Sequence, residues 1–320
     1  MLEIKNLSLT VPLQGQQVTA VSDVSLQIQA GKTLALVGES GCGKSLTAQS
    51  LLRLGEFQGV HRTAGDITLS GKSLFDMSDK TLRTMRGGAV AMIFQEPMTA
   101  LNPVFSIGSQ ILEVIALHTN LDKRAAHERA LNLLHDVGLQ DGEALLRQYP
   151  DALSGGMRQR ILIAMAMAGD PDFIIADEPT TALDVSVQKR IVALLRKLQQ
   201  DKGLGMLLVT HDFGLVAEMA DDVAVMYAGE IIEQAPVMQI FDQPAHPYTR
   251  ALMQCRPEAT LYGERLTVIP GNVPAPGAWA TGCRFQQRCT WAQDACQNPV
   301  SLQAWQAATH QARCLRVGET

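Results

Sequence analysis

The octet GESGCGKS, residues 38–45, constrains the fold of this chain more than any other stretch. It fits the pattern GxxxxGK[ST], in which glycines allow successive backbone N–H groups to converge on a phosphate. An apolar run at residues 34–37 precedes the octet, and a helix-compatible run at 46–54 follows it. A strand, a glycine-rich loop and a helix in this order predict a phosphate-binding P-loop within an α/β fold.

The side chains of this loop have distinct expected roles. Lys44 is expected to reach the β- and γ-phosphate oxygens of a nucleotide, and the Ser45 hydroxyl to ligate Mg²⁺. The residues predicted to bind the nucleotide are Gly38, Glu39, Ser40, Gly41, Cys42, Gly43, Lys44 and Ser45.

Composition excludes several other classes of protein. Of 320 residues, 46% are apolar and 18% charged, as in an ordinary globular protein. The net charge of −5 argues against a nucleic-acid-binding protein, which would show a basic patch. No apolar stretch approaches the roughly 18 residues of a membrane span, and the N-terminus lacks the pattern of a signal peptide. We expect the chain to stay in the cytosol, with any membrane link made through other subunits.

Hydrophobic patterning predicts the order of the elements. Residues 1–30 alternate loosely, as half-buried antiparallel strands do, and residues 65–76 resemble a further hairpin. Residues 122–137 carry helical periodicity, with Asp122 as the expected N-cap. The apolar runs 173–176 and 206–210 do not alternate, which is typical of buried parallel strands. Beyond about residue 236, prolines and glycines indicate an appended small domain.

Two further motifs can serve a phosphate. In LSGGMRQR, residues 153–160, a Ser-Gly-Gly turn opens a predicted helix whose free N–H groups and dipole suit an anion. The helix should end near Gly169 and Pro171. In FIIADE, residues 173–178, a buried strand ends in paired carboxylates, 23 residues after Ser154 (177 − 154). Such a pair can supply one ligand to Mg²⁺ and one group to an attacking water.

In order and spacing these motifs resemble those of ABC ATPases. The resemblance implies that Asp177 is the Walker B ligand of Mg²⁺, together with Ser45 and Gln95. It implies Glu178 as general base, His211 as the switch histidine and Gln95 as the Q-loop glutamine. Asp184 corresponds to the D-loop, and Ser154, Gly155, Gly156 and Gln159 to a signature that contacts the ATP of a second ATPase subunit.

Two positions depart from the family pattern. Thr181 replaces a serine beside the D-loop and keeps a hydroxyl. Val18 stands where an aromatic residue commonly stacks on adenine, and residues 1–37 contain no Phe, Tyr or Trp. Adenine would then be held by apolar contact alone, and we expect GTP to compete with ATP better than in aromatic-bearing relatives.

Four cysteines follow late in the chain, as Cys283-x5-Cys289-x6-Cys296-x17-Cys314. Their spacing leaves an iron–sulfur cluster, zinc and unliganded thiols open, and disulfides are disfavoured in the cytosol. Nearby, HPYT (246–249), PGNVP (270–274) and GCRFQQRC (282–289) resemble the C-terminal extension of dipeptide/oligopeptide/nickel importer ATPases. That resemblance implies a [4Fe–4S] cluster on these four cysteines.

The combined interpretation is an ATP-hydrolysing subunit of an importer for peptides or for chelates of nickel or other metals. The expected fold is an α/β P-loop NTPase core at residues 1–235, with an antiparallel β-subdomain, a helical subdomain near 97–165 and the cysteine-bearing extension at 236–320. Expected cofactors are ATP, Mg²⁺ and the [4Fe–4S] cluster.

The resemblance implies a set of partners rather than a chain acting alone. They are a second ATPase subunit, identical or merely homologous, two permease subunits docking near residues 98–108, and, indirectly, an extracytoplasmic binding protein. No nucleic acid is expected. The expected location is peripheral, on the cytoplasmic face of the inner membrane. The alternatives are an ATPase acting on ribosomes or nucleic acid, and an exporter ATPase.

Overall fold

The computed structural model describes residues 1–181, 183–255 and 268–317. Its contacts divide the chain into two compact units. The helical unit comprises Asp76–Leu208 with Ile28–Lys32 and Met1. The P-loop unit comprises Leu2–Gln27, Thr33–Phe75 and Val209–Thr320, so the C-terminal extension shares a unit with the N-terminal strands. The division into domains at 1–235 and 236–320 remains a prediction, because the boundaries of the two compact units lie at other residues.

An antiparallel sheet opens the P-loop unit, as the alternating sequence predicts. Its order is β2-β1-β4-β5, and β1 pairs with β4 from Leu2↔Leu69 onward. The apolar residues of β1, such as Leu2, Ile4 and Leu7, are buried, whereas Lys5 and Asn6 are exposed. The strands are β1 (Leu2–Leu13), β2 (Gln16–Ile28), β4 (His61–Leu69) and β5 (Lys72–Ser73).

A second set of strands in this unit runs in the order β11-β12-β10-β9-β3. β3 and β9 are parallel, and the other pairs are antiparallel. The strands are β3 (Thr33–Val37), β9 (Asp222–Tyr227), β10 (Glu230–Pro236), β11 (Gln303–Trp305) and β12 (Ala307–Ala312). The helices are α1 (Lys44–Ser50), α9 (Phe213–Met219), α10 (Val237–Asp242) and α11 (Pro247–Gln254), with 3-10 turns η1 (Gly55–Gln58) and η4 (Asp294–Gln297).

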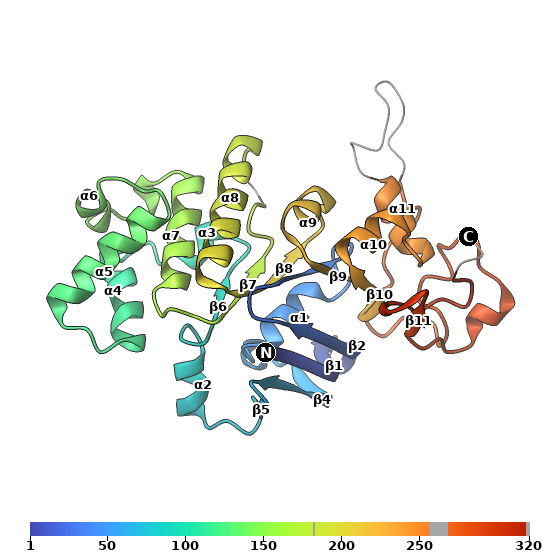
Figure 1. Ribbon diagram of the computed structural model, residues 1–320. Helices are drawn as coiled ribbons and strands as arrows, with labels where there is room; N and C mark the ends of the chain where they lie inside the picture. Colours follow the sequence, from blue (N-terminus) through green and yellow to red (C-terminus); the bar gives the residue numbers. More distant parts are fainter. Residues whose placement is uncertain (182, 256–267, 318–320) are drawn as a thin grey trace. The chain divides into compact units, whose positions relative to one another are not determined.

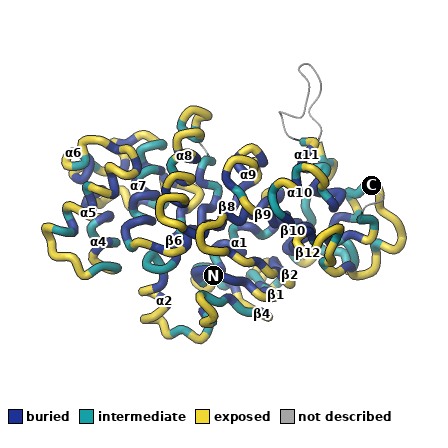
Figure 2. Tube along the Cα trace, viewed as in Figure 1, coloured by how far each residue is buried: buried dark blue, intermediate teal, exposed yellow. Residues whose placement is uncertain are grey.

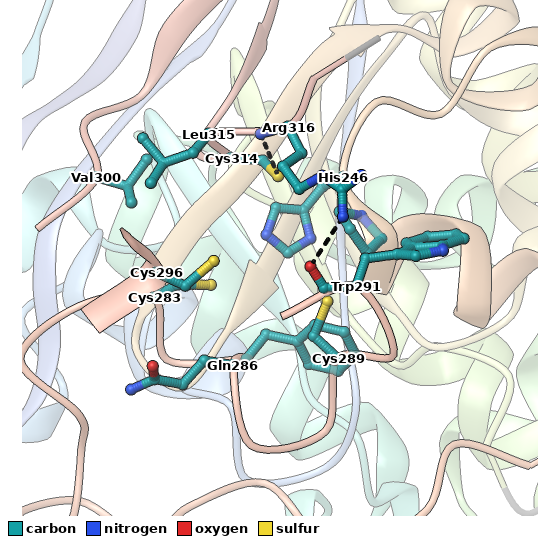
Figure 3. A pocket seen from close by; sticks show the side chains of 12 residues that line it. His246, Cys283, Gln286, Cys289, Trp291, Cys296, Val300, Cys314, Leu315 and Arg316 are labelled. Atoms are coloured by element: carbon teal, nitrogen blue, oxygen red, sulfur yellow. Dashed lines mark hydrogen bonds between the residues drawn. The ribbon is translucent and has the colours of Figure 1, made fainter. Parts of the chain in front are cut away.

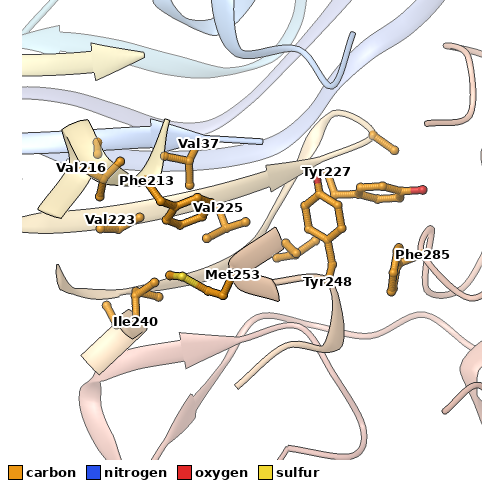
Figure 4. Packing of buried hydrophobic residues seen from close by; sticks show 14 residues of the cluster. Val37, Phe213, Val216, Val223, Val225, Tyr227, Ile240, Tyr248, Met253 and Phe285 are labelled. Carbon is orange, nitrogen blue, oxygen red and sulfur yellow. The ribbon is translucent and has the colours of Figure 1, made fainter. Parts of the chain in front are cut away.

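One apolar core joins these strands to the extension (Figure 4). Val37 and Val225 pack with Phe213, Ile240 and Met253. At the end of β9 the core becomes aromatic and includes Tyr227, Tyr248 and Phe285. The extension is therefore packed into the core of the P-loop unit.

The helical unit contains β6 (Val90–Ile93), β7 (Phe173–Asp177) and most of β8 (Gly205–Thr210), in the order β8-β7-β6. β6 and β7 are parallel, and every residue of β7 and β8 is buried, which confirms the expectation from their unbroken apolar sequences (Figure 2). The helices are α2 (Asp79–Met85), α3 (Pro97–Ala100), α4 (Ile107–His118), α5 (Lys123–Asp136), α6 (Gly142–Leu146), α7 (Gly155–Met167) and α8 (Val185–Lys202), with a 3-10 turn η2 (Pro150–Ala152).

Figure 1 shows these helices, and local sequence accounts for where four of them begin. The Asp122 carboxylate accepts the Ala125 N–H at 2.8 Å and starts α5, as predicted. Ser106, Ser154 and Asp184 cap α4, α7 and α8 in the same way. In the described parts of the chain, no helix is both long enough and apolar enough to cross a membrane.

The Glu233 carboxylate, just before the extension, is a buried polar centre of the P-loop unit. It is fully buried in β10 and accepts the backbone N–H groups of Ala245 and His246 at 2.6 and 2.8 Å. His310 Nε2, on β12, lies 2.8 Å from the same carboxylate. Glu233 thus joins β10, the start of α11 and β12.

We predict that Glu233→Ala destabilises the protein strongly. The substitution leaves buried donors without an acceptor, and each such group costs about 1–3 kcal/mol, so the free energy of unfolding should fall by about 3 kcal/mol or more. Urea unfolding measures this loss. Arg124→Ala, which removes an exposed ion pair with Glu128, is the control and should change stability little. Equal stability of the two variants would contradict the role of Glu233.

Candidate functional site

The P-loop connects β3 to α1 and lies directly against β9. A Cβ on Gly38 would collide with the carbonyl oxygen of Met226, and one on Gly43 would lie 2.9 Å from that residue's Cε and 3.2 Å from Ala20 O. Both glycines have positive φ. The Cys42 carbonyl also accepts the Gly229 N–H at 2.8 Å. These contacts explain why the loop needs glycine at two of its positions.

Lys44 is buried within the loop. Its ammonium donates to the carbonyl oxygens of Gly38 at 2.7 Å and Glu39 at 3.0 Å. Cys42 is buried beside it, and burial raises the pKa of its thiol. Ser45 follows in the first turn of α1, whereas Ser40 and Gly41 are exposed. The charge of Lys44 is thus already inside the loop, next to the position expected for phosphate.

Glu178 is oriented by two neighbours in the helical unit. It follows the buried Asp177 at the end of β7 and has a φ of 46°, in the left-handed region. Gln95 Nε2 and the Thr181 hydroxyl both donate to Glu178 Oε2, at 3.2 and 2.8 Å. The structure therefore brings Gln95 to Glu178, and the catalytic roles of both remain predictions. It also gives the Thr181 hydroxyl a partner that the sequence did not reveal.

The signature motif forms a capped helix start. Ser154 caps α7 by accepting the Met157 N–H, and Ser154 and Gly155 are exposed. A Cβ on Gly156 would lie 2.8 Å from Val187 Cγ1 of α8, so this glycine permits close helix packing. Gln159 is buried and donates to the Pro179 carbonyl at 2.9 Å. Its side chain faces the loop after Glu178, and its contact with a partner's ATP remains a prediction.

The remaining expected residues lie at the start of a helix, after a strand and within a strand. Asp184 caps α8, and the hydrogen bonds from Ser186 and Val187 hold the pKa of its carboxyl below the usual value. His211 is exposed after β8, just before the cap of α9. Val18 is half-buried on β2, and a Cβ on Gly277 of the extension would lie 3.4 Å from its Cγ1.

The expected ATP-site residues fall in both units. The P-loop and His211 belong to the P-loop unit, and Gln95, Asp177, Glu178, Asp184 and the signature belong to the helical unit. Within each unit the structure assembles its own part: the loop with Lys44 in one, and Gln95 with Glu178 in the other.

The four late cysteines line one pocket of the P-loop unit (Figure 3). His246, Phe285, Trp291, Val300 and Leu315 complete much of its wall. The Cys283 N–H donates to the Cys296 carbonyl at 2.8 Å, and the Arg316 N–H donates to Cys314 Sγ at 3.3 Å. Cys255 does not line this pocket.

Burial in this pocket raises the pKa values of three of its thiols, which favours their protonated form. Burial raises the pKa of Cys283 to about 12 and also raises the pKa values of Cys289 and Cys314. A cationic group would have to displace these protons on binding. Among the described residues, no three His, Cys, Asp or Glu side chains converge as they would around one metal ion.

Two known protein families match separate segments of this chain. The ABC transporter family matches residues 21–181, and the "Oligopeptide/dipeptide transporter, C-terminal region" matches residues 232–296. A Brucella abortus protein named "Putative peptide import ATP-binding protein" is 47% identical over 302 residues, covering 94% of this chain and 91% of its own. A second Brucella abortus protein of that name is 45% identical over 326 residues, covering 98% and 96%.

Solved structures agree with this grouping. The ATP-binding cassette MJ0796, a dimer in a post-hydrolysis state bound to ADP and Pi, is 26% identical with a TM-score of 0.66. The alignment covers 74% of this chain and 99% of that one. The cbiO1 protein of Clostridium perfringens, part of the ABC transporter complex cbiONQ, is 26% identical with a TM-score of 0.64, covering 76% and 90%. This chain belongs to the ABC transporter family, as an ATP-hydrolysing cassette that carries the C-terminal region of oligopeptide/dipeptide transporters.

Proposed function

We propose that this chain powers an importer of peptides, with nickel chelates as the second candidate cargo. The observation that carries the proposal is the joint presence of the cassette and the extension in one chain, matched over nearly its whole length by relatives named for peptide import. An ATPase acting on ribosomes or nucleic acid is less well supported. The C-terminal region of this chain matches a transporter family, and its net charge of −5 does not favour binding to nucleic acid. The extension likewise argues against an exporter.

The proposed chemistry is hydrolysis of ATP by a positioned water. Glu178 would take the proton of that water, and Gln95 and Thr181 hold its carboxylate in place. Lys44 would bind the phosphate oxygens, and His211 would contact the γ-phosphate. Ser45, Gln95 and Asp177 offer the hard oxygen ligands that Mg²⁺ prefers, and Mg²⁺ would neutralise phosphate charge. Ser154, Gly155 and Gly156 would serve the ATP of a second ATPase subunit.

We predict that Glu178→Gln lowers the rate of ATP hydrolysis by about 10²–10⁴-fold while ATP still binds. Because ATP then persists, the variant should also form a dimer in the presence of MgATP. Phosphate release and size-exclusion chromatography measure these two results. Glu143→Gln, an exposed carboxylate paired with His127, is the matched control and should hydrolyse ATP normally. Full activity of Glu178→Gln would remove Glu178 from the proposed role.

Permease docking is proposed for the segment after Gln95. Its side chains Met98, Val104 and Phe105 are 63%, 72% and 54% exposed, which is unusual for large apolar residues. A helix of a permease subunit would cover them. The chain would then lie on the cytoplasmic face of the inner membrane, with an extracytoplasmic binding protein supplying the cargo to two permease subunits.

A [4Fe–4S] cluster is proposed for Cys283, Cys289, Cys296 and Cys314. The four thiols line one pocket with a largely apolar wall, and the Arg316 N–H already donates to one sulfur. Each thiolate of such a cluster ligates a different iron, so the sulfurs need to surround a volume rather than converge on one point. When bound, the cluster would cross-link the loops of the extension.

We predict about four iron and four sulfide per chain after anaerobic purification, with absorbance near 400 nm. Cys283→Ser and Cys296→Ser should lose this absorbance, because each removes a ligand. Cys255→Ser is the matched control and should keep it, since Cys255 lies outside the pocket. A colourless protein that contains zinc instead would disprove the cluster.

A further inference from the structure

Glu39, the second residue of the P-loop, is held on three sides. Its carbonyl accepts the Lys44 ammonium at 3.0 Å. Its backbone N–H donates to the Tyr248 hydroxyl at 2.9 Å, and its carboxylate lies 3.1 Å from Arg288 Nη1. Tyr248 and Arg288 both belong to the C-terminal region, beyond the part that matches the ABC transporter family. Two residues of the extension therefore contact the loop directly.

Burial, helix capping and ring packing hold the Tyr248 side chain in place. It is fully buried in the first turn of α11, where the His246 side chain caps the helix by accepting the Tyr248 N–H at 3.0 Å. Its ring packs edge-on against the Tyr227 ring, with the ring centroids 4.7 Å apart, and its centroid lies 5.3 Å from that of the Phe285 ring (Figure 4). The hydroxyl thus presents an acceptor to Glu39 from a rigid base.

Arg288 is equally constrained. Its side chain is 6% exposed, and its three nitrogens are all engaged. Nε donates to the Pro270 carbonyl at 2.8 Å, and Nη2 to the Ile269 carbonyl at 3.3 Å. Nη1 donates to Glu39 and, at 3.4 Å, to the Tyr227 hydroxyl. A guanidinium held by two backbone carbonyls has little freedom to leave the Glu39 carboxylate.

We propose that the C-terminal extension completes the nucleotide site, with Tyr248 and Arg288 as positioning residues that hold Glu39 and, through its carbonyl, the ammonium of Lys44. Both would act on the loop rather than on the nucleotide: Tyr248 accepts the Glu39 backbone N–H, and Arg288 binds the Glu39 carboxylate. The loop then has its binding conformation before MgATP arrives. Losing such a contact leaves the loop free to relax, and MgATP binding must then order it again. The proposal rests on ATP binding by the P-loop and is independent of the cargo and of the cysteine-bound group.

The test uses the full-length chain and MgATP as the probe. Equilibrium binding of MgATP is measured for the wild type, Tyr248→Phe, Arg288→Gln and Arg288→Lys, together with hydrogen exchange of residues 38–45 in the absence of nucleotide. Tyr248→Phe keeps the ring packing and removes the hydroxyl alone. Arg250→Gln is the control, because Arg250 also donates to a backbone carbonyl in the extension, at 2.8 Å to Pro244, without reaching Glu39.

The expected result is a MgATP Kd raised about two- to tenfold by Tyr248→Phe and Arg288→Gln, the range of one net hydrogen bond, with faster exchange in the loop. Arg288→Lys, which keeps a cation for Glu39, should show a smaller rise, and Arg250→Gln none. Glu39→Gln is measured alone and together with Arg288→Gln, and the double variant should raise Kd no further than the larger single effect.

Unchanged Kd and loop exchange in Tyr248→Phe and Arg288→Lys, alongside a lower Tm, would overturn the proposal, because packing alone would then explain both residues. If Arg288→Gln does not fold, these two milder variants decide the question. The wild-type Kd separates this outcome from a failure of the ATPase assignment, since a chain without MgATP affinity would contradict the function itself.

Discussion

The close approach of the P-loop to strand β9 is the constraint on which the rest of the site depends. Gly38 and Gly43 lie against Met226 with no room for a side chain, and the turn after β9 binds the loop through Gly229. The next residue of β9, Tyr227, packs on Tyr248 and Phe285 of the extension. One strand therefore supports the loop and anchors the C-terminal region, which is why the two parts of the chain meet at Glu39.

The sequence predicts those elements that depend on hydrophobic patterning or helix capping among neighbouring residues. Alternation gives β1 and β2, unbroken apolar runs give β7 and β8, and Asp122 marks the start of α5. Contacts between distant residues leave no such trace. Arg288 reaches Glu39 across 249 residues, and nothing in the spacing of either indicates it. The inward position of Gln159 and the bond from Thr181 to Glu178 likewise depend on tertiary packing.

The extension adds polar and aromatic contacts to the apolar core that it shares with the strands of the P-loop unit. Its sequence is rich in proline and glycine and offers short strands and 3-10 turns rather than long amphipathic elements. The buried carboxylate of Glu233 just before it, an aromatic cluster and a pocket of four thiols supplement the shared apolar core. Short motifs in its sequence indicate its resemblance to an importer family, whereas only the structure reveals its contact with Glu39 of the P-loop.

Binding of ATP by this loop is tested most directly by measuring the MgATP affinity of the Lys44→Ala variant. The control variant is Lys202→Ala, because the Lys202 ammonium pairs with Asp170 on the surface. Because Lys44 offers a charged donor to the phosphates, its loss should weaken binding about tenfold or more, while Lys202→Ala binds as the wild type does. Equal affinity of Lys44→Ala and the wild type would contradict the account.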